Sequence, residues 1–209
     1  MENILPDKFY EFGSGWNNNI DFDYESKSLL NVLDNAKKEN DIQKNIKDNK
    51  KWFIPASIFK DYDFGHHEAY IVPEQTLGSE YRVDYMLLGK NSMGYHIIFV
   101  EFEDVNTDFI LKNSNTESDS VRKGLTQIRD WQLWIDSNKE YFFRSCGIDK
   151  IANNIPSWGI NYCLVVSRRG RMDDRANSLR GMLMNNYREL KIISYDRLVD
   201  NVKRLVNGF

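Results

Sequence analysis

Two apolar segments interrupted by acidic residues constrain this chain more than any other feature. They run from Tyr81 to Leu88 and from Tyr95 to Phe102, with Asp84 inside the first and Glu101 and Glu103 at the end of the second. Alternate residues of a strand share a face, so Glu101 and Glu103 point the same way. The turn-rich GKNSMG between the segments is typical of an antiparallel hairpin. The pattern therefore predicts three carboxyl groups that converge at one end of a sheet.

Converging carboxylates need a counterion. They repel one another unless a cation or protons lie among them, and hard divalent ions prefer carboxylate oxygens as ligands. We therefore expect Mg²⁺ or Mn²⁺ at Asp84, Glu101 and Glu103.

A helix is predicted after the second acidic segment, beyond a polar loop over residues 104–120. Apolar residues recur at helical spacing from Ser120 to about Asn138, and Lys123 and Gln127 lie one turn apart. Gln127 is either a solvated helix residue or a residue that orients water or phosphate at the acids. Lys123 is long enough to bring a positive charge to them. Trp131 and Trp134 either stack on bases or, as we favour, are core or interface residues.

The N-terminal part is expected to hold an irregular arm over residues 1–22, followed by a single domain over residues 23–209. Helical spacing from Tyr24 to Asp48 predicts one long helix, and Glu39 falls on its apolar stripe. A carboxylate there either reaches past the stripe edge to water or finds a partner at the acidic site. Residues 52–59 and 69–72 are β-like, and Pro55 makes the first of these an edge or bent strand.

Four segments resemble a known family: AKKENDIQKNI (36–46), LGSEYRVDYMLL (77–88), HIIFVEFE (96–103) and GLTQIRDWQLWI (124–135). The layout resembles the PD-(D/E)xK nuclease core, and within that superfamily the Shedu-type antiphage defence nucleases, also classed as DUF4263. The resemblance implies a restriction-endonuclease-like α/β fold with a central mixed sheet flanked by helices. It further implies a metal-dependent DNA endonuclease of prokaryotic defence that forms homo-oligomers, with Glu39 as an outer metal ligand. Shedu proteins usually carry extra N-terminal control domains, so a regulatory protein or a phage trigger is expected.

One departure from the superfamily pattern bears on activity. The pattern has Glu-x-Lys where this chain has Glu101-Phe102-Glu103. A lysine there would orient or deprotonate the attacking water, whereas Glu103 would bind metal or accept a proton. The alternative function is therefore a catalytically inactive nuclease-fold module that binds nucleic acid or a protein partner.

The C-terminal third alternates strand, helix, strand, helix from Ile160 to Val206, which predicts an α/β extension of the sheet. Arg168, Arg169 and Arg171 lie on the loop after its first strand. They either contact a DNA backbone or decorate a solvated loop. Charge is unevenly distributed, because residues 168–209 hold ten basic and five acidic side chains, whereas residues 52–120 hold 12 acidic and four basic ones. This asymmetry suits a metal site beside a phosphate-binding surface.

Composition limits the class of protein. With 209 residues, 41% hydrophobic and 28% charged, the chain suits one globular domain. No apolar run approaches the roughly 20 residues of a membrane span, and the N-terminus lacks a secretory signal, so we expect a cytoplasmic protein. Cys146 and Cys163 are expected to be reduced thiols, and the adjacent His66 and His67 are not expected to share a metal ion.

Overall fold

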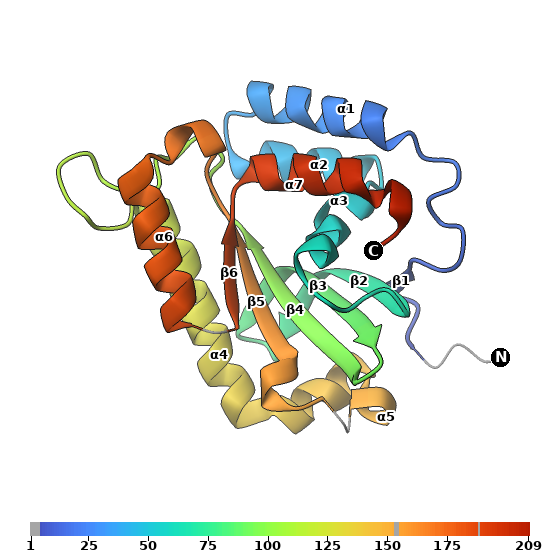
Figure 1. The fold of residues 1–209 in the computed structure, drawn as a ribbon. Coiled ribbons are helices and arrows are strands. Elements are labelled where there is room, and N and C mark those ends of the chain that lie inside the picture. The colour runs from blue at the N-terminus through green and yellow to red at the C-terminus, as the bar shows by residue number, and fades with distance from the viewer. Residues whose placement is uncertain (1–4, 153–154, 188) are drawn as a thin grey trace.

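A six-stranded mixed sheet forms the centre of the computed structural model, which describes residues 5–152, 155–187 and 189–209 (Figure 1). The spatial order of the strands follows the chain, with antiparallel pairing from β1 to β4 and parallel pairing from β4 to β6. The predicted α/β fold with a mixed sheet is thereby confirmed. The strands are β1 (Tyr10–Glu11), β2 (Glu68–Leu77), β3 (Tyr81–Asn91), β4 (Gly94–Phe102), β5 (Ile160–Val165) and β6 (Leu190–Ile193).

Helices cover both faces of the sheet. Figure 1 shows α4 and α6 on one side, and α1, α2, α3 and α7 on the other. Each side has its own apolar core, so neighbouring strand residues such as Met86 and Leu87 enter different cores. Burial on both faces explains the nearly continuous apolar runs of β3 and β4. The helices are α1 (Phe22–Asn35), α2 (Glu39–Asp48), α3 (Phe53–Ala56), α4 (Asp119–Cys146), α5 (Asp149–Ala152), α6 (Asp174–Asn186) and α7 (Tyr195–Lys203).

Strands β3 and β4 form the predicted antiparallel hairpin. Asn91 pairs with Gly94 at the turn, and pairing continues to Tyr85 and Val100. Gly94 has φ 123°, a backbone conformation that favours glycine. Beyond Tyr85 and Val100 the regular ladder stops, and the Asp84 carboxylate accepts a hydrogen bond from the Phe102 N–H at 2.8 Å. The acids therefore lie where the hairpin opens.

Two predicted elements were wrong in the N-terminal half. The single helix over residues 24–48 is two helices, because the chain breaks between Asn35 and Glu39. There the Asp41 carboxylate accepts the N–H groups of Lys37 and Lys38 at 2.9 and 3.2 Å and so starts α2. The β-like run over residues 52–59 is helical, comprising α3 and the 3-10 helix η1 (Ser57–Asp61). Proline is tolerated in the first turn of a helix, where its missing N–H is not needed.

The predicted arm is held against the domain where the structure describes it, from residue 5 onward, and residues 1–4 lie outside the described residues. Strand β1 lies within this arm and pairs with β2, and the sequence did not predict β1. Phe12 and Trp16 lie against Phe209, with ring centroids 5.2 and 5.0 Å apart, and so join the arm to the end of the chain.

The C-terminal half largely follows the sequence prediction. Helix α4 extends past Asn138, where it kinks and continues to Cys146. Trp131 and Trp134 are buried in the core, as predicted, and β5, α6, β6 and α7 form the predicted extension. Cys146 and Cys163 are both buried free thiols. Among the described residues, no helix combines the length and apolar character needed to cross a bilayer.

Candidate active site

Four carboxylic side chains gather where the β3–β4 hairpin opens, and we call Glu39, Asp84, Glu101 and Glu103 the acid centre. Strand β3 supplies Asp84, Glu101 is the penultimate residue of β4, and Glu103 directly follows the end of that strand. Both glutamates are almost fully buried, with exposed fractions of 5% for Glu101 and 2% for Glu103. The Glu103 N–H donates to the Val165 carbonyl, so pairing with β5 holds the backbone of this segment in place. The predicted convergence of the strand acids is therefore present.

Glu39 belongs to this cluster rather than to open solvent. It is half-buried at the start of α2, and the side-chain amide of Gln43, one turn later, donates to its carboxylate at 2.8 Å. Burial, followed by the charges of Asp84 and Glu103, raises the pKa of Glu39 to about 7. The break between α1 and α2 therefore does not separate Glu39 from the strand acids.

Helix α4 brings a cation to the acid centre. The Lys123 ammonium lies 2.8 Å from a carboxylate oxygen of Glu103. Gly124 allows this approach, because a Cβ built there would lie 2.5 Å from Leu164 Cδ1 and 3.0 Å from Glu103 Cγ. The sequence analysis missed Gly124, although a glycine inside an amphipathic helix can indicate close packing. One turn after Lys123, Gln127 has a buried side-chain oxygen without a hydrogen-bond partner among the described residues.

Negative charge in this cluster exceeds the positive charge available to it. Burial, reinforced by the charges of Asp84, Glu103 and Glu39, raises the pKa of Glu101 to about 10. Burial also raises the pKa of Asp84, although the Phe102 N–H opposes that shift. The pKa of Glu103 is raised by burial too, against the effect of Lys123. Among the described residues, Lys123 forms the ion pair with this cluster and the Arg82 charge also acts on Asp84, so protons or a further cation must make up the difference.

The donor set fits a hard divalent ion. Carboxylate oxygens are the ligands that Mg²⁺ and Mn²⁺ prefer. The Gln127 oxygen, which has no hydrogen-bond partner in the described part of the chain, adds a neutral acceptor on the neighbouring helix. Within residues 5–152, 155–187 and 189–209, no three acidic, histidine or cysteine side chains already stand in an arrangement that holds an ion. An ion would therefore have to draw the carboxylates of the acid centre closer together.

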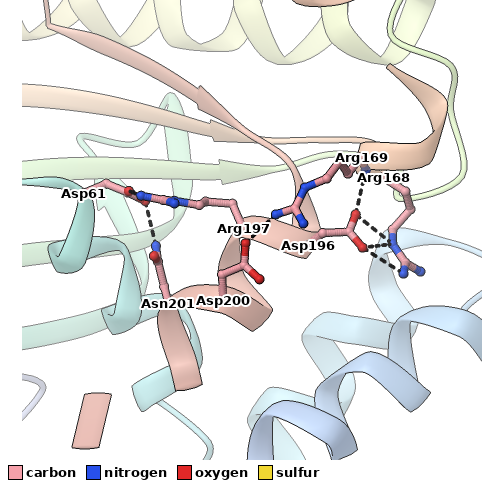
Figure 2. A network of polar contacts seen from close by, with 7 residues as sticks. All are labelled: Asp61, Arg168, Arg169, Asp196, Arg197, Asp200 and Asn201. Carbon is pink, nitrogen blue, oxygen red and sulfur yellow. Dashed lines mark hydrogen bonds and ion pairs between the residues drawn. The ribbon is translucent and has the colours of Figure 1, made fainter. Parts of the chain in front are cut away.

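The three arginines of the loop after β5 are ion-paired, not simply solvated, and Figure 2 shows Arg168 and Arg169 with their partners. Arg168 has a side chain only 19% exposed and donates to both carboxylate oxygens of Asp196 and, at 2.9 Å, to Asp34. It therefore ties the end of β5 to α7 and α1. A matching pair forms between the more exposed Arg169 and Asp200.

Arg171 differs from Arg168 in its exposure. Its guanidinium lies 3.3 Å from Asp108 in the loop before α4, and its side chain is 45% exposed. Arg169 is 63% exposed. Arg169 and Arg171 thus retain surface that can face a phosphate, whereas the guanidinium of Arg168 is largely occupied.

The structure defines a class of protein. It is an α/β domain whose central hairpin opens onto a buried cluster of carboxylates, with a lysine on the adjoining helix. Residues 36–199 match the family model of the C-terminal region of the Shedu protein SduA. That match covers most of the chain, so the chain belongs to this Shedu family, and the resemblance predicted from the sequence is confirmed. No curated protein matches the chain.

Two solved structures of the restriction endonuclease FokI are similar to this one. The DNA-bound structure aligns with a TM-score of 0.47 at 8% identity, over 94% of this chain and 32% of the other. The other FokI structure aligns with a TM-score of 0.44 at 11% identity, over 91% of this chain and 29% of the other. The chain therefore spans about a third of the length of the FokI chains that it matches.

Proposed function

We propose that this chain is a metal-dependent DNA endonuclease that acts in prokaryotic antiphage defence in the manner of Shedu nucleases. Membership of the Shedu family supports a nuclease. The observation that carries the proposal is the burial of Glu101 among three other carboxylic groups. Such a cluster costs folding free energy unless a cation binds there, and a cation site of hard oxygen ligands suits phosphodiester hydrolysis.

Asp84 and Glu101 would hold Mg²⁺ or Mn²⁺, with Glu39 as an outer ligand. A bound ion of this kind polarises a scissile phosphate and lowers the pKa of its water. The protein orients these ligands through its backbone, because the Phe102 N–H fixes the Asp84 carboxylate. Gln43 similarly fixes Glu39.

Lys123 takes the place of the lysine that the Glu-x-Glu segment lacks. It reaches Glu103 from α4 and not from the strand. Although partial burial opposes it, the interaction with Glu103 raises the pKa of Lys123, so the ammonium stays protonated and donates hydrogen bonds to water or phosphate. Glu103 then anchors Lys123 or serves as a third ligand or proton acceptor, and Gln127 positions the water or a phosphate oxygen.

DNA is the proposed substrate, and one of the similar FokI structures is described as bound to DNA. Arg169 and Arg171 are the proposed backbone contacts, with Arg168 holding their loop in place. Homo-oligomer assembly and control by a regulatory protein or phage trigger are proposed from the family. The cytoplasm is the proposed compartment, because both cysteines are free thiols.

The second candidate is a catalytically inactive module that binds nucleic acid or a protein partner. The observation in its favour is the ion pair between Glu103 and Lys123, which already neutralises part of the acid centre. The observation against it is the remaining excess of buried carboxylic groups, because they would lower the stability of such a module without serving its function.

A nuclease assay separates the two candidates. Supercoiled and linear DNA are incubated with wild type, Glu101→Gln and the control Glu140→Gln, which lies exposed on α4. With Mn²⁺ or Mg²⁺ we expect nicking or cutting by wild type and control, inhibition by chelation, and a loss of about 1000-fold or more in Glu101→Gln. DNA binding should persist in that variant. Wild type that binds Mn²⁺ and DNA without cutting either substrate would favour the inactive module.

A further inference from the structure

A cationic cavity of about 510 Å³ lies beside the edge strand β6, between α6 and α7. Four basic side chains line it, namely Arg169, Arg180, Lys191 and Arg197, against a single acid, Asp61. Met172, Met184, Ile192 and Ile193 add apolar wall. No residue of the acid centre lines this cavity, so it is a separate feature of the molecule.

Asp61 does not neutralise the four cations. Its carboxylate, only 9% exposed, accepts from Arg197 at 2.5 Å and from Asn201 at 2.6 Å, as Figure 2 shows. Arg169 is held by Asp200. The Lys191 ammonium donates to the backbone carbonyl of Asp61 and lies 4.1 Å from the ring centroid of Tyr62. It has no carboxylate partner among the described residues.

Arg180 is the least compensated cation. Among the described residues its Nε is buried without a hydrogen-bond partner, and the guanidinium contact found there is a weak one of 3.8 Å to Met172 Sδ. A guanidinium cannot lose its proton under physiological conditions, so burial leaves a charge that an anion would stabilise. Burial lowers the pKa of Arg180, and repulsion from the Arg169 cation adds to that shift.

We propose that this cavity binds a phosphate group. Phosphate oxygens accept several charge-assisted hydrogen bonds at once, which arginine forks supply in matching geometry. The volume is within the range of small-molecule sites, and the methionine and isoleucine wall can pack against an apolar or flat part of the same ligand. A free nucleotide and the phosphorylated end of a nucleic acid both carry this chemistry. The inference does not depend on whether the acid centre hydrolyses DNA.

Calorimetry in the presence of EDTA tests the proposal without a contribution from metal. The probes are pyrophosphate, ATP, and one short single-stranded oligonucleotide with and without a 5′-phosphate. The variants are Arg180→Gln, which removes the charge, and Arg180→Lys, which keeps it. Arg175→Gln is the matched control, because Arg175 lies on the same helix but contacts Ser114 and Asn115. Melting temperatures of all variants establish that they fold.

We expect wild type and Arg175→Gln to bind pyrophosphate or ATP with similar affinity, and Arg180→Gln to lose about 10-fold or more. Arg180→Lys should fall between them. If only the 5′-phosphorylated oligonucleotide binds, and its binding depends on Arg180, the phosphate comes from a nucleic acid end. The proposal fails if no probe binds wild type at millimolar concentration, or if Arg180→Gln and Arg175→Gln weaken binding equally.

Discussion

The acid centre and the arginine loop after β5 are both rich in charge, but the charges of the arginine loop are paired with opposite charges, whereas most of those in the acid centre are not. Asp196 accepts three hydrogen bonds from the Arg168 guanidinium, and this arginine, although burial opposes it, holds the pKa of Asp196 below its usual range. In the acid centre, Glu101 is buried among like charges and its pKa is raised to about 10. Matched charges tie elements together, whereas the unmatched ones form a site that a ligand completes.

Charge exchange within the acid centre should give an effect second only to that of Glu101→Gln. Glu103→Lys alone places two ammonium groups together and should reduce cleavage by about 100-fold or more, as should Lys123→Glu. The double variant restores an ion pair and creates the usual Glu-x-Lys segment. Its cleavage rate, measured on supercoiled DNA, should recover toward wild type. Additive losses in the double variant would show that Glu103 is needed as a ligand.

Removal of Arg168 should mainly affect stability. Arg168→Met leaves Asp196 and Asp34 without their partner, which should cost about 2 kcal/mol and lower the melting temperature by about 4–8 °C. Thermal unfolding measures the change, and DNA cleavage below the melting temperature should be nearly unchanged. The matched substitution Arg169→Met should cost much less, because its pair is exposed. Equal costs would remove the distinction between the two arginines.

With metal chelated, the pH dependence of the free energy of unfolding should reveal the unpaired carboxyl groups of the acid centre. The pKa of Glu101 is raised from 4.5 to about 10, so the folded state binds a proton that the unfolded state releases. Its contribution is full below pH 4.5 and falls as the pH rises toward 10, and Glu39 acts likewise between 4.5 and about 7.

Glu101→Gln should therefore flatten the decline in melting temperature between pH 5.5 and 8. For each pH unit in this window, wild type should lose about 1 kcal/mol more than Glu101→Gln, or about 2–4 °C more in melting temperature. Unfolding curves of both proteins in EDTA measure it. Parallel curves would show that Glu101 is ionised in the folded protein at neutral pH.

The smallest expected effect concerns the exposed arginines. Replacing Arg169 and Arg171 by alanine should weaken binding to DNA of any sequence and reduce the salt slope of the binding constant by about 1–2. Filter binding at several salt concentrations gives the slope. An unchanged slope would assign both residues to the ion pairs with Asp200 and Asp108 alone.

The sequence predicted the strand acids well, because strand periodicity and a short turn are local signals. Asp84, Glu101 and Glu103 needed only the hairpin to bring them together. The break before Glu39 was not predictable from apolar spacing, since it depends on the Asp41 side chain capping two N–H groups. The role of Arg168 depends on partners 28 and 134 residues away, and no local pattern reveals such contacts.

A titration with Mn²⁺ is the decisive measurement, because the proposed cleavage needs a divalent ion at the acid centre. Calorimetry compares wild type with Asp84→Asn, which preserves shape and removes one charge, and with Asp196→Asn, which removes the charge on α7 that pairs with Arg168. Wild type and Asp196→Asn should bind one or more ions with similar affinity, release protons on binding and gain melting temperature, whereas Asp84→Asn should lose most of the affinity. Equal binding by all three proteins, or none by wild type, would rule out a divalent-ion site at the acid centre.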